Sequence, residues 1–224
     1  FISSPHPSVI NSVALDACRY PISSDLRVSM CSVSTDSSML IYHRNYYGNE
    51  CVSSSRLSSI VHSKPIIDVS ICIDLDLIAS IDGDLLILSS LRTASFLSSA
   101  RLIGEPKNVL ITKNGNIIVS TQIFDQKSTP KTLLSCYGMR CNLVSTVEMN
   151  SIIVFQSTIT IHSYSEFLVT GYENRTISFI KIPFPADAQQ IDTPCLFLSA
   201  SYISENKTIF FAGENGKIYS FHLK

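Results

Sequence analysis

The sequence of 224 residues contains no tryptophan and only 8 glycines, and charged side chains make up just 16% of it. Scarce glycine leaves little material for the glycine-rich loops that cradle phosphate groups. The chain has no nucleophile elbow, no phosphate-binding loop and no zinc-protease motif. Its formal net charge of −1 creates no long-range field that would attract nucleic acid or an anionic membrane. These absences argue against the commonest classes of enzyme and of nucleic-acid-binding protein.

Long apolar runs and paired cysteines are missing as well. Every hydrophobic run is shorter than about 18 residues, and the first residues show no signal-peptide pattern, so we expect neither a membrane-spanning helix nor secretion. The seven cysteines are scattered without a Cys-x-x-Cys pair. Cys31, Cys72 and Cys136 lie in apolar patterns, where a free cysteine packs as a small hydrophobe. We therefore expect a reduced, cytoplasmic protein without disulfides, metal or cofactor.

What the sequence does contain is a succession of short apolar, β-branched segments separated by turns, which favours strands over helices. Leu77 to Leu88 is the clearest case, because two apolar runs flank Asp82-Gly83, a dipeptide typical of hairpin turns. Similar hairpins are expected around Asp36, Glu173 and Asn215. The first and last intervals between these turns are about 45 residues and the middle one is about twice that, so a further hairpin is expected near residue 127.

A period of about 45 residues with four strands per unit is typical of propeller blades. We therefore predict an all-β chain, a β-propeller with five degenerate blades in a single domain spanning residues 1–224. The predicted blades are residues 8–59, 62–100, 104–146, 147–182 and 195–224, and the proline-containing segment 183–194 is predicted to be a loop. The last blade ends after its third strand. Two interpretations remain open. The chain is part of a larger propeller, or it forms a ring that is closed when residues 1–4 pair with the last strand at the far end of the chain.

Several short stretches give the sequence a family resemblance. Residues 79–83 and 87–93 read ASIDG and ILSSLRT, and they resemble a degenerate WD repeat in which Ser89-Ser90 stand for Trp-Asp. More specifically, residues 69–80 (VSICIDLDLIAS), 90–93 (SLRT) and 210–218 (FFAGENGKI) resemble the C-terminal propeller of BEACH-domain proteins, the beige and neurobeachin group. Ala94 departs from the glycine usual after Leu-Arg-Thr. His62, Ser80 and Asp82 match three members of the hydrogen-bonded set of WD blades, whose fourth member, tryptophan, is absent.

The resemblance implies a ring of about seven blades, with two further blades and a BEACH domain upstream. It also implies a non-catalytic scaffold in membrane trafficking, on the cytosolic side of vesicles or endolysosomes, with other proteins as partners. Two alternatives remain. One is a WD-repeat subunit of another multiprotein complex, nuclear or RNA-processing. The other is an enzyme with a site in the axial channel, where several ionisable groups would have to converge; the inner strands offer mainly aliphatic and hydroxyl side chains plus Asp68.

We expect partners to contact the face formed by the loops that join strand four to strand one and strand two to strand three. Charges of both signs interleave there, which favours specificity and association rate. The predicted members are His62, Lys64, Asp82, Asp84, Arg101, Glu105, Lys107, Lys127, Glu173, Arg175 and Glu214. The residues predicted to shape turns are His62, Ser80, Asp82, Gly83, Gly171, Gly213 and Gly216. Tyr46-Tyr47 next to Arg44 is read either as a solvated turn or as part of a binding surface.

Overall fold

The computed structural model describes residues 6, 8–19, 25–124, 130–161, 165–185, 190–203 and 206–222, which form strands and turns throughout. Within these residues, no helix is long and apolar enough to span a membrane. The strands form five antiparallel sheets, four of four strands and one of three, and strands adjacent in sequence are also adjacent in each sheet. The all-β prediction is confirmed. The chain divides into two compact units, Phe1–Val119 with Gly138–Asn142 and Ser120–Tyr137 with Leu143–Lys224.

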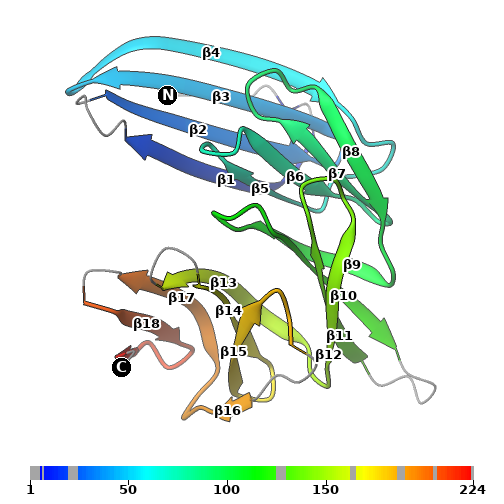
Figure 1. Ribbon diagram of the computed structural model, residues 1–224, viewed down its shortest axis with the longest axis vertical. Helices are drawn as coiled ribbons and strands as arrows, with labels where there is room; N and C mark the ends of the chain where they lie inside the picture. Colours follow the sequence, from blue (N-terminus) through cyan, green and yellow to red (C-terminus); the bar gives the residue numbers. More distant parts are fainter. Residues whose placement is uncertain are drawn as a thin grey trace. The chain divides into compact units, whose positions relative to one another are not determined.

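The first sheet has the longest strands, and Figure 1 shows them side by side as blue and cyan ribbons. They are β1 (Ile10–Arg19), β2 (Asp25–Ser34), β3 (Ser38–Tyr47) and β4 (Glu50–Ile60). Exposed and half-buried residues alternate in β1, as expected of a strand with one face against a core. The turn between β2 and β3 is fixed by Asp36, whose carboxylate accepts the backbone N–H of Ser38 at 2.9 Å.

The second sheet consists of β5 (Asp68–Cys72), β6 (Leu77–Ile81), β7 (Leu85–Ser90) and β8 (Phe96–Arg101). Its two central strands are buried almost throughout, which explains why their sequences read as continuous apolar runs. The hairpin predicted at Asp82-Gly83 joins β6 to β7. In Asp-Gly hairpin turns the glycine usually adopts a positive φ, but Gly83 is not among the glycines with positive φ, so the turn does not need glycine for that reason. The carboxylate of Asp82 holds the turn instead.

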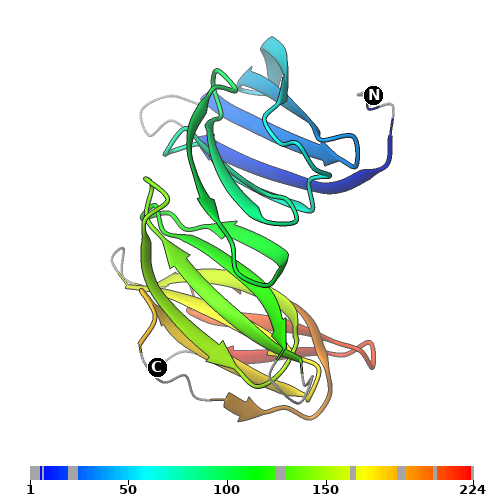
Figure 2. The same ribbon diagram turned by 90° about the vertical axis from the view of Figure 1, so that its right-hand side faces the viewer.

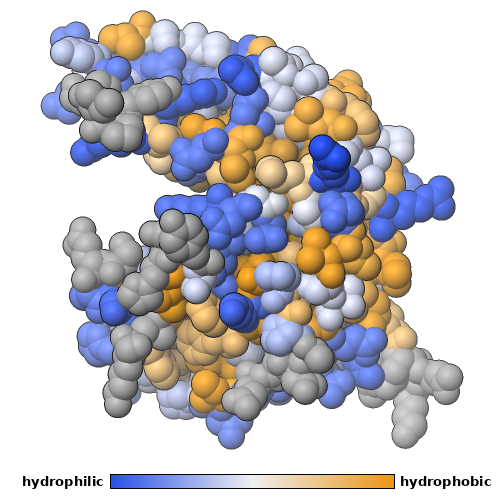
Figure 3. Space-filling view, viewed as in Figure 1, coloured by the Kyte–Doolittle hydropathy of each residue, from blue (hydrophilic) through white to orange (hydrophobic). Residues whose placement is uncertain are grey.

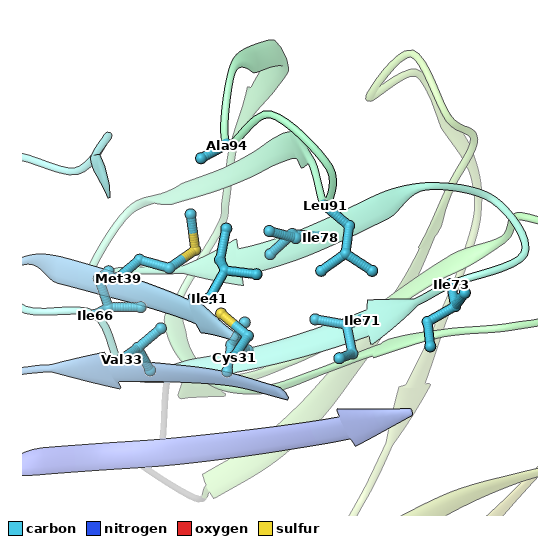
Figure 4. Close-up of a cluster of buried hydrophobic side chains, with 11 residues drawn as sticks. Cys31, Val33, Met39, Ile41, Ile66, Ile71, Ile73, Ile78, Leu91 and Ala94 are labelled. Carbon is cyan, nitrogen blue, oxygen red and sulfur yellow. The ribbon is translucent and has the colours of Figure 1, made fainter. Parts of the chain in front are cut away.

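A core lies between the first and second sheets (Figure 4). From the first sheet, Cys31, Val33, Met39 and Ile41 are fully buried. The second sheet and the segments next to its strands contribute the remaining buried members, which are Ile66, Val69, Ile71, Ile73, Ile78, Leu91 and Ala94. Burying apolar surface between sheets stabilises the fold by about 25 cal/mol per Å². Cys31 behaves as the predicted buried hydrophobe, and burial raises the pKa of its thiol to about 12.

The third sheet consists of β9 (Glu105–Ile111), β10 (Ile117–Phe124), β11 (Pro130–Tyr137) and β12 (Leu143–Met149). Figure 2 shows its strands in green and yellow-green. Strands β10 and β11 form the hairpin expected near residue 127, although its tip, residues 125–129, lies outside the described part of the chain. The boundary between the two units passes through this sheet.

The fourth sheet consists of β13 (Ile153–Ile161), β14 (Ser165–Tyr172), β15 (Thr176–Ile182) and β16 (Gln190–Asp192). The fifth consists of β17 (Phe197–Ile203), β18 (Thr208–Gly213) and β19 (Ile218–His222). A core of aromatic and aliphatic side chains lies between them. Within it, Phe211 stacks on Phe197 at a centroid distance of 4.8 Å and meets Phe155 edge-on at 6.2 Å.

One segment predicted as loop differs from the prediction. Residues 183–194 include β16, which pairs with β15 through Thr176↔Asp192 and Ile177↔Ile191. All three residues of β16 are exposed. Backbone pairing at the edge of a sheet requires no apolar pattern, so composition could not reveal this strand.

Candidate functional site

A buried polar network holds the turn at one end of the second sheet. The side chain of His62 precedes β5, that of Ser80 lies in β6, and that of Asp82 opens the β6–β7 turn. His62 Nδ1 lies 2.9 Å from Asp82 Oδ2, and His62 Nε2 lies 2.8 Å from Ser80 Oγ. The side chains of His62 and Asp82 are both 0% exposed. The three residues that match the WD set therefore touch one another.

Asp82 is the centre of this network. Its Oδ1 accepts the backbone N–H of Asp84 at 3.0 Å and of Leu85 at 2.8 Å. Burial acts to raise the pKa of Asp82, but these N–H groups together with His62 outweigh it and lower the pKa below the ordinary range. His62 and Asp82 were also predicted on the partner-binding face. Because both are buried, that assignment is wrong for them. Their hydrogen bonds hold the β6–β7 turn in place, and they do not reach the surface themselves.

The first sheet carries a related arrangement around His6. Its Nδ1 lies 2.8 Å from Ser38 Oγ, and its Nε2 lies 2.9 Å from Ser32 Oγ. Ser38 Oγ in turn donates to the carboxylate of Asp36. In each of the first two sheets, a histidine that precedes an inner strand therefore hydrogen-bonds to a serine of a strand. His62 also contacts the turn carboxylate of Asp82 directly, whereas His6 is linked to that of Asp36 through Ser38.

The fourth sheet uses hydroxyl groups instead. Thr170 Oγ1, Tyr172 Oη and Ser178 Oγ form a buried triangle with sides of 2.6, 2.7 and 2.8 Å. Burial raises the pKa of Tyr172. No sequence pattern indicates this set, because threonine, tyrosine and serine occur in many strands.

The opposite end of the second sheet is held by Asp76. Its carboxylate accepts Ser90 Oγ–H at 3.0 Å and the backbone N–H of Arg92 at 2.8 Å. Ser89, which the predicted resemblance to a WD repeat aligns with tryptophan, is 0% exposed, and its Oγ has no hydrogen-bond partner among the described residues. The side chain at this position is therefore small and buried, and the carboxylate of Asp76 holds the turn.

On the surface of the first unit, the predicted loop residues form local ion pairs. Lys64 Nζ lies 2.9 Å from Asp84 Oδ1, and Lys107 Nζ lies 2.7 Å from Glu105 Oε1. The first pair raises the pKa of Lys64 through its hydrogen bond to Asp84. The Asp84 carbonyl also accepts the N–H of Leu102, which links the β6–β7 turn to the segment after β8. Arg101, at the end of β8, is exposed.

Ile103 adds an apolar group to this set, which the sequence analysis missed. It lies between Arg101 and Glu105 in the same connection and is 71% exposed. A single isoleucine carries no pattern in sequence, and only the structure shows that its side chain is exposed. The view in Figure 3 shows such orange groups interspersed with blue ones on each unit.

In the second unit, Arg175 Nη2 lies 3.4 Å from Glu214 Oε1, so two successive hairpin turns are linked. Glu173 is exposed in the same turn as Arg175. Lys127 falls in residues 125–129, outside the described part of the chain. Two of the predicted turn glycines have a clear structural reason. Gly216 adopts φ +74°, which favours glycine, and a Cβ on Gly171 would overlap the ring of Phe155. Gly213 closes β18, with its N–H bonded to the Lys217 carbonyl.

Asp68, in an inner strand of the first unit, is the ionisable residue that an enzyme site in the axial channel would use. Asp68 in β5 accepts Ser12 Oγ–H from β1 at 2.6 Å and the backbone N–H of Val109 in β9 at 2.9 Å. Burial raises its pKa, and these hydrogen bonds act in the opposite direction. Both carboxylate oxygens are thus engaged in joining three strands. Among the described residues, no cluster of three or more potential metal ligands occurs.

Comparison with solved structures decides the fold. A crystal structure of BBS1N in complex with ARL6DN matches with a TM-score of 0.70 and 12% sequence identity, covering 100% of this chain and 67% of that one. A second crystal structure of the same complex gives 0.67 and 11%, covering 98% and 67%. This chain is a β-propeller. Its five sheets are blades, as predicted. No family model and no curated protein matches the propeller sequence.

Proposed function

We propose that this propeller is a non-catalytic platform that binds other proteins through its loop face. The observation that carries the proposal is the surface of Lys64, Asp84, Glu105 and Lys107, which form two ion pairs. The connection between β8 and β9 adds the exposed side chain of Ile103 and is joined to the β6–β7 turn by the hydrogen bond from Leu102 N–H to the Asp84 carbonyl. Such a mixture favours selective, fast association. The buried His62–Asp82 pair fixes the turn that presents Asp84.

The similar propeller BBS1N supports this proposal, because it was crystallised in complex with another protein, ARL6DN. The inner-strand carboxylate of Asp68 supports it as well, since its hydrogen bonds give it a structural task. A site for a small substrate would instead need a carboxylate with an oxygen left available for chemistry.

The cellular setting that we propose is membrane trafficking, on the cytosolic side of vesicles or endolysosomes, next to a BEACH domain in the same protein. Its support is the resemblance of residues 69–80, 90–93 and 210–218 to BEACH-associated propellers. A tagged form of the protein should then co-localise with endolysosomal markers. Accumulation in the nucleus would contradict this setting and favour the nuclear or RNA-processing complex.

Charge reversal on the loop face tests the binding function. Lys64→Glu with Lys107→Glu alters the first unit, Arg175→Glu alters the second, and Arg92→Glu is a matched control in a turn at the other end of the second sheet. Proximity labelling followed by mass spectrometry should show partners that the loop variants lose and the control retains. If the Lys64→Glu/Lys107→Glu variant and the Arg175→Glu variant both label the same proteins as the unaltered chain, the loop face is not the binding surface.

A further inference from the structure

The outer edge of the first sheet is unusually long. Strand β4 has 11 residues and is the last strand of its sheet, whereas the outer strands β8, β12 and β16 have 6, 7 and 3. Figure 1 shows β4 as the cyan ribbon along the border of the first unit. Nine of its residues are exposed, and Leu57 and Ser59 are half-buried. Among the described residues, no backbone hydrogen bond reaches the side of β4 that faces away from β3.

Strand β4 also lacks most features that prevent strand edges from pairing. Such edges are usually protected by proline, lysine, inward-pointing charges, bulges or short length. The sequence of β4, ECVSSSRLSSI, has neither proline nor lysine. A bulge lies near its beginning, between Asn45 and Tyr46 of β3, but Ser53–Ile60 pairs in continuous register. Alternate residues of this eight-residue stretch therefore point their backbone N–H and C=O groups away from β3, where a further strand could pair with them.

The sheet face next to this edge is basic. Ile41 and Leu57, a cross-strand pair, pack toward the second sheet, so their neighbours Tyr42 and Arg56 point to the opposite face. Arg44 lies on that same face, directly opposite Ser54 and diagonal to Arg56. Both arginines are exposed, and neither forms an ion pair within the described residues.

The acidic residues of this sheet belong to its other face. Asp16 accepts the backbone N–H of Ile73 in the second sheet at 2.8 Å, and the register places Asp25 and Glu50 on the same side. The basic face therefore carries positive charge with no carboxylate of its own sheet to balance it. An acidic partner would complement it.

We propose that the outer edge of β4 takes up an extended acidic segment of a partner protein as an additional strand. The segment's backbone pairs with Ser53–Ile60, and carboxylates on its alternate residues lie over Arg44 and Arg56. The proposal rests on the binding function above and adds a second surface to it. A row of unpaired backbone groups selects a peptide over a nucleic acid or a lipid, which cannot complete the ladder. A second copy of this edge would bring Arg56 against like charge, which disfavours self-pairing.

Two synthetic peptides test this proposal with the 224-residue protein. One is a fluorescein-labelled nonapeptide of alternating valine and glutamate, and its control has lysine in place of glutamate. Fluorescence anisotropy should show saturable binding of the acidic peptide only. Arg44→Glu with Arg56→Glu should weaken binding by about tenfold, while Arg140→Glu, an exposed arginine that also has no ion pair among the described residues, should leave it unchanged.

Hydrogen exchange distinguishes strand addition from simple charge attraction and needs no variant. The acidic peptide should slow exchange at alternate amides of Ser53–Ile60, which are the amides that point away from β3. Peptide binding without this protection would overturn the proposal, as would equal binding of the lysine peptide or no binding at all. Protection of β4 that rises with protein concentration and needs no peptide would identify a second copy as the occupant and would also overturn it.

The two surfaces can fail independently. If the peptide experiments fail while the Lys64, Lys107 and Arg175 variants lose partners, the edge proposal falls and the loop-face function stands. If the peptide protects β4 while those variants keep every partner, the loop face is wrong and the edge remains.

Discussion

Replacing Asp82 by alanine should be one of the most damaging changes to a polar side chain of this propeller. The carboxylate accepts three hydrogen bonds, from His62 Nδ1 at 2.9 Å and from the N–H groups of Asp84 and Leu85 at 3.0 and 2.8 Å. Loss of the acceptor leaves the buried His62 donor unsatisfied, at a cost of about 2 kcal/mol, and removes about 0.5 kcal/mol for each half-exposed amide. The free energy of unfolding should therefore fall by about 3 kcal/mol.

Urea titration followed by far-UV circular dichroism measures this loss, since the chain has no tryptophan to serve as a fluorescent probe. Asp84→Ala is the matched control in the same turn. Its side chain is 50% exposed and pairs with Lys64, so the control should lose less than about 1 kcal/mol. A double-mutant cycle with His62→Ala should give a coupling of at least about 1 kcal/mol. If Asp82→Ala and Asp84→Ala have the same small effect, the network does not hold the turn.

Three other outcomes follow from the buried groups. Phe211→Ala should lower the free energy of unfolding by about 3 to 5 kcal/mol, because it empties the aromatic core between the fourth and fifth sheets; an unchanged urea midpoint would contradict this packing. Ser89→Ala should leave stability unchanged or raise it, because its buried Oγ has no partner among the described residues; a clear loss in thermal midpoint would show otherwise. Burial, with a smaller contribution from Arg27, lowers the pKa of His43, so the unfolded chain takes up a proton more readily. Stability should therefore fall as pH drops below 6.5, the ordinary value for histidine, and His43→Gln should remove that step in urea midpoints measured across this range.

The propeller could be predicted because its hairpins repeat. Strands that alternate or run continuously apolar, with turns at Asp36, Asp82, Glu173 and Asn215, required only local sequence to recognise. The network of His62, Ser80 and Asp82 was also expected, because the set occurs in WD blades. The burial of this network was not predicted. The sequence indicates which residues can form hydrogen bonds, but only the packing of the surrounding strands shows that the side chains of His62 and Asp82 are inaccessible to a partner protein.

Features that depend on register between distant segments could not be predicted. Asp68 joins Ser12 and Val109, which lie 56 and 41 residues away, and nothing local to any of the three indicates the contact. The basic face was hidden for a similar reason. Arg44 and Arg56 look scattered in sequence, and only the pairing of β3 with β4 brings them together. Tyr46 and Tyr47 were expected in a loop, yet both end β3.

His43 connects two neighbouring blades. Its Nε2 donates to the Leu91 carbonyl, in the turn after β7, at 3.0 Å, while its Nδ1 accepts from Ser29 Oγ in the first sheet at 2.9 Å. Local opening of the Leu91 turn therefore breaks the hydrogen bond that the buried His43 imidazole donates. Local opening of β2 at Ser29 breaks the hydrogen bond that the imidazole accepts. Amide protons near Ser29 and near Leu91 should consequently report one shared opening energy, and the pair of blades should melt as a single cooperative block.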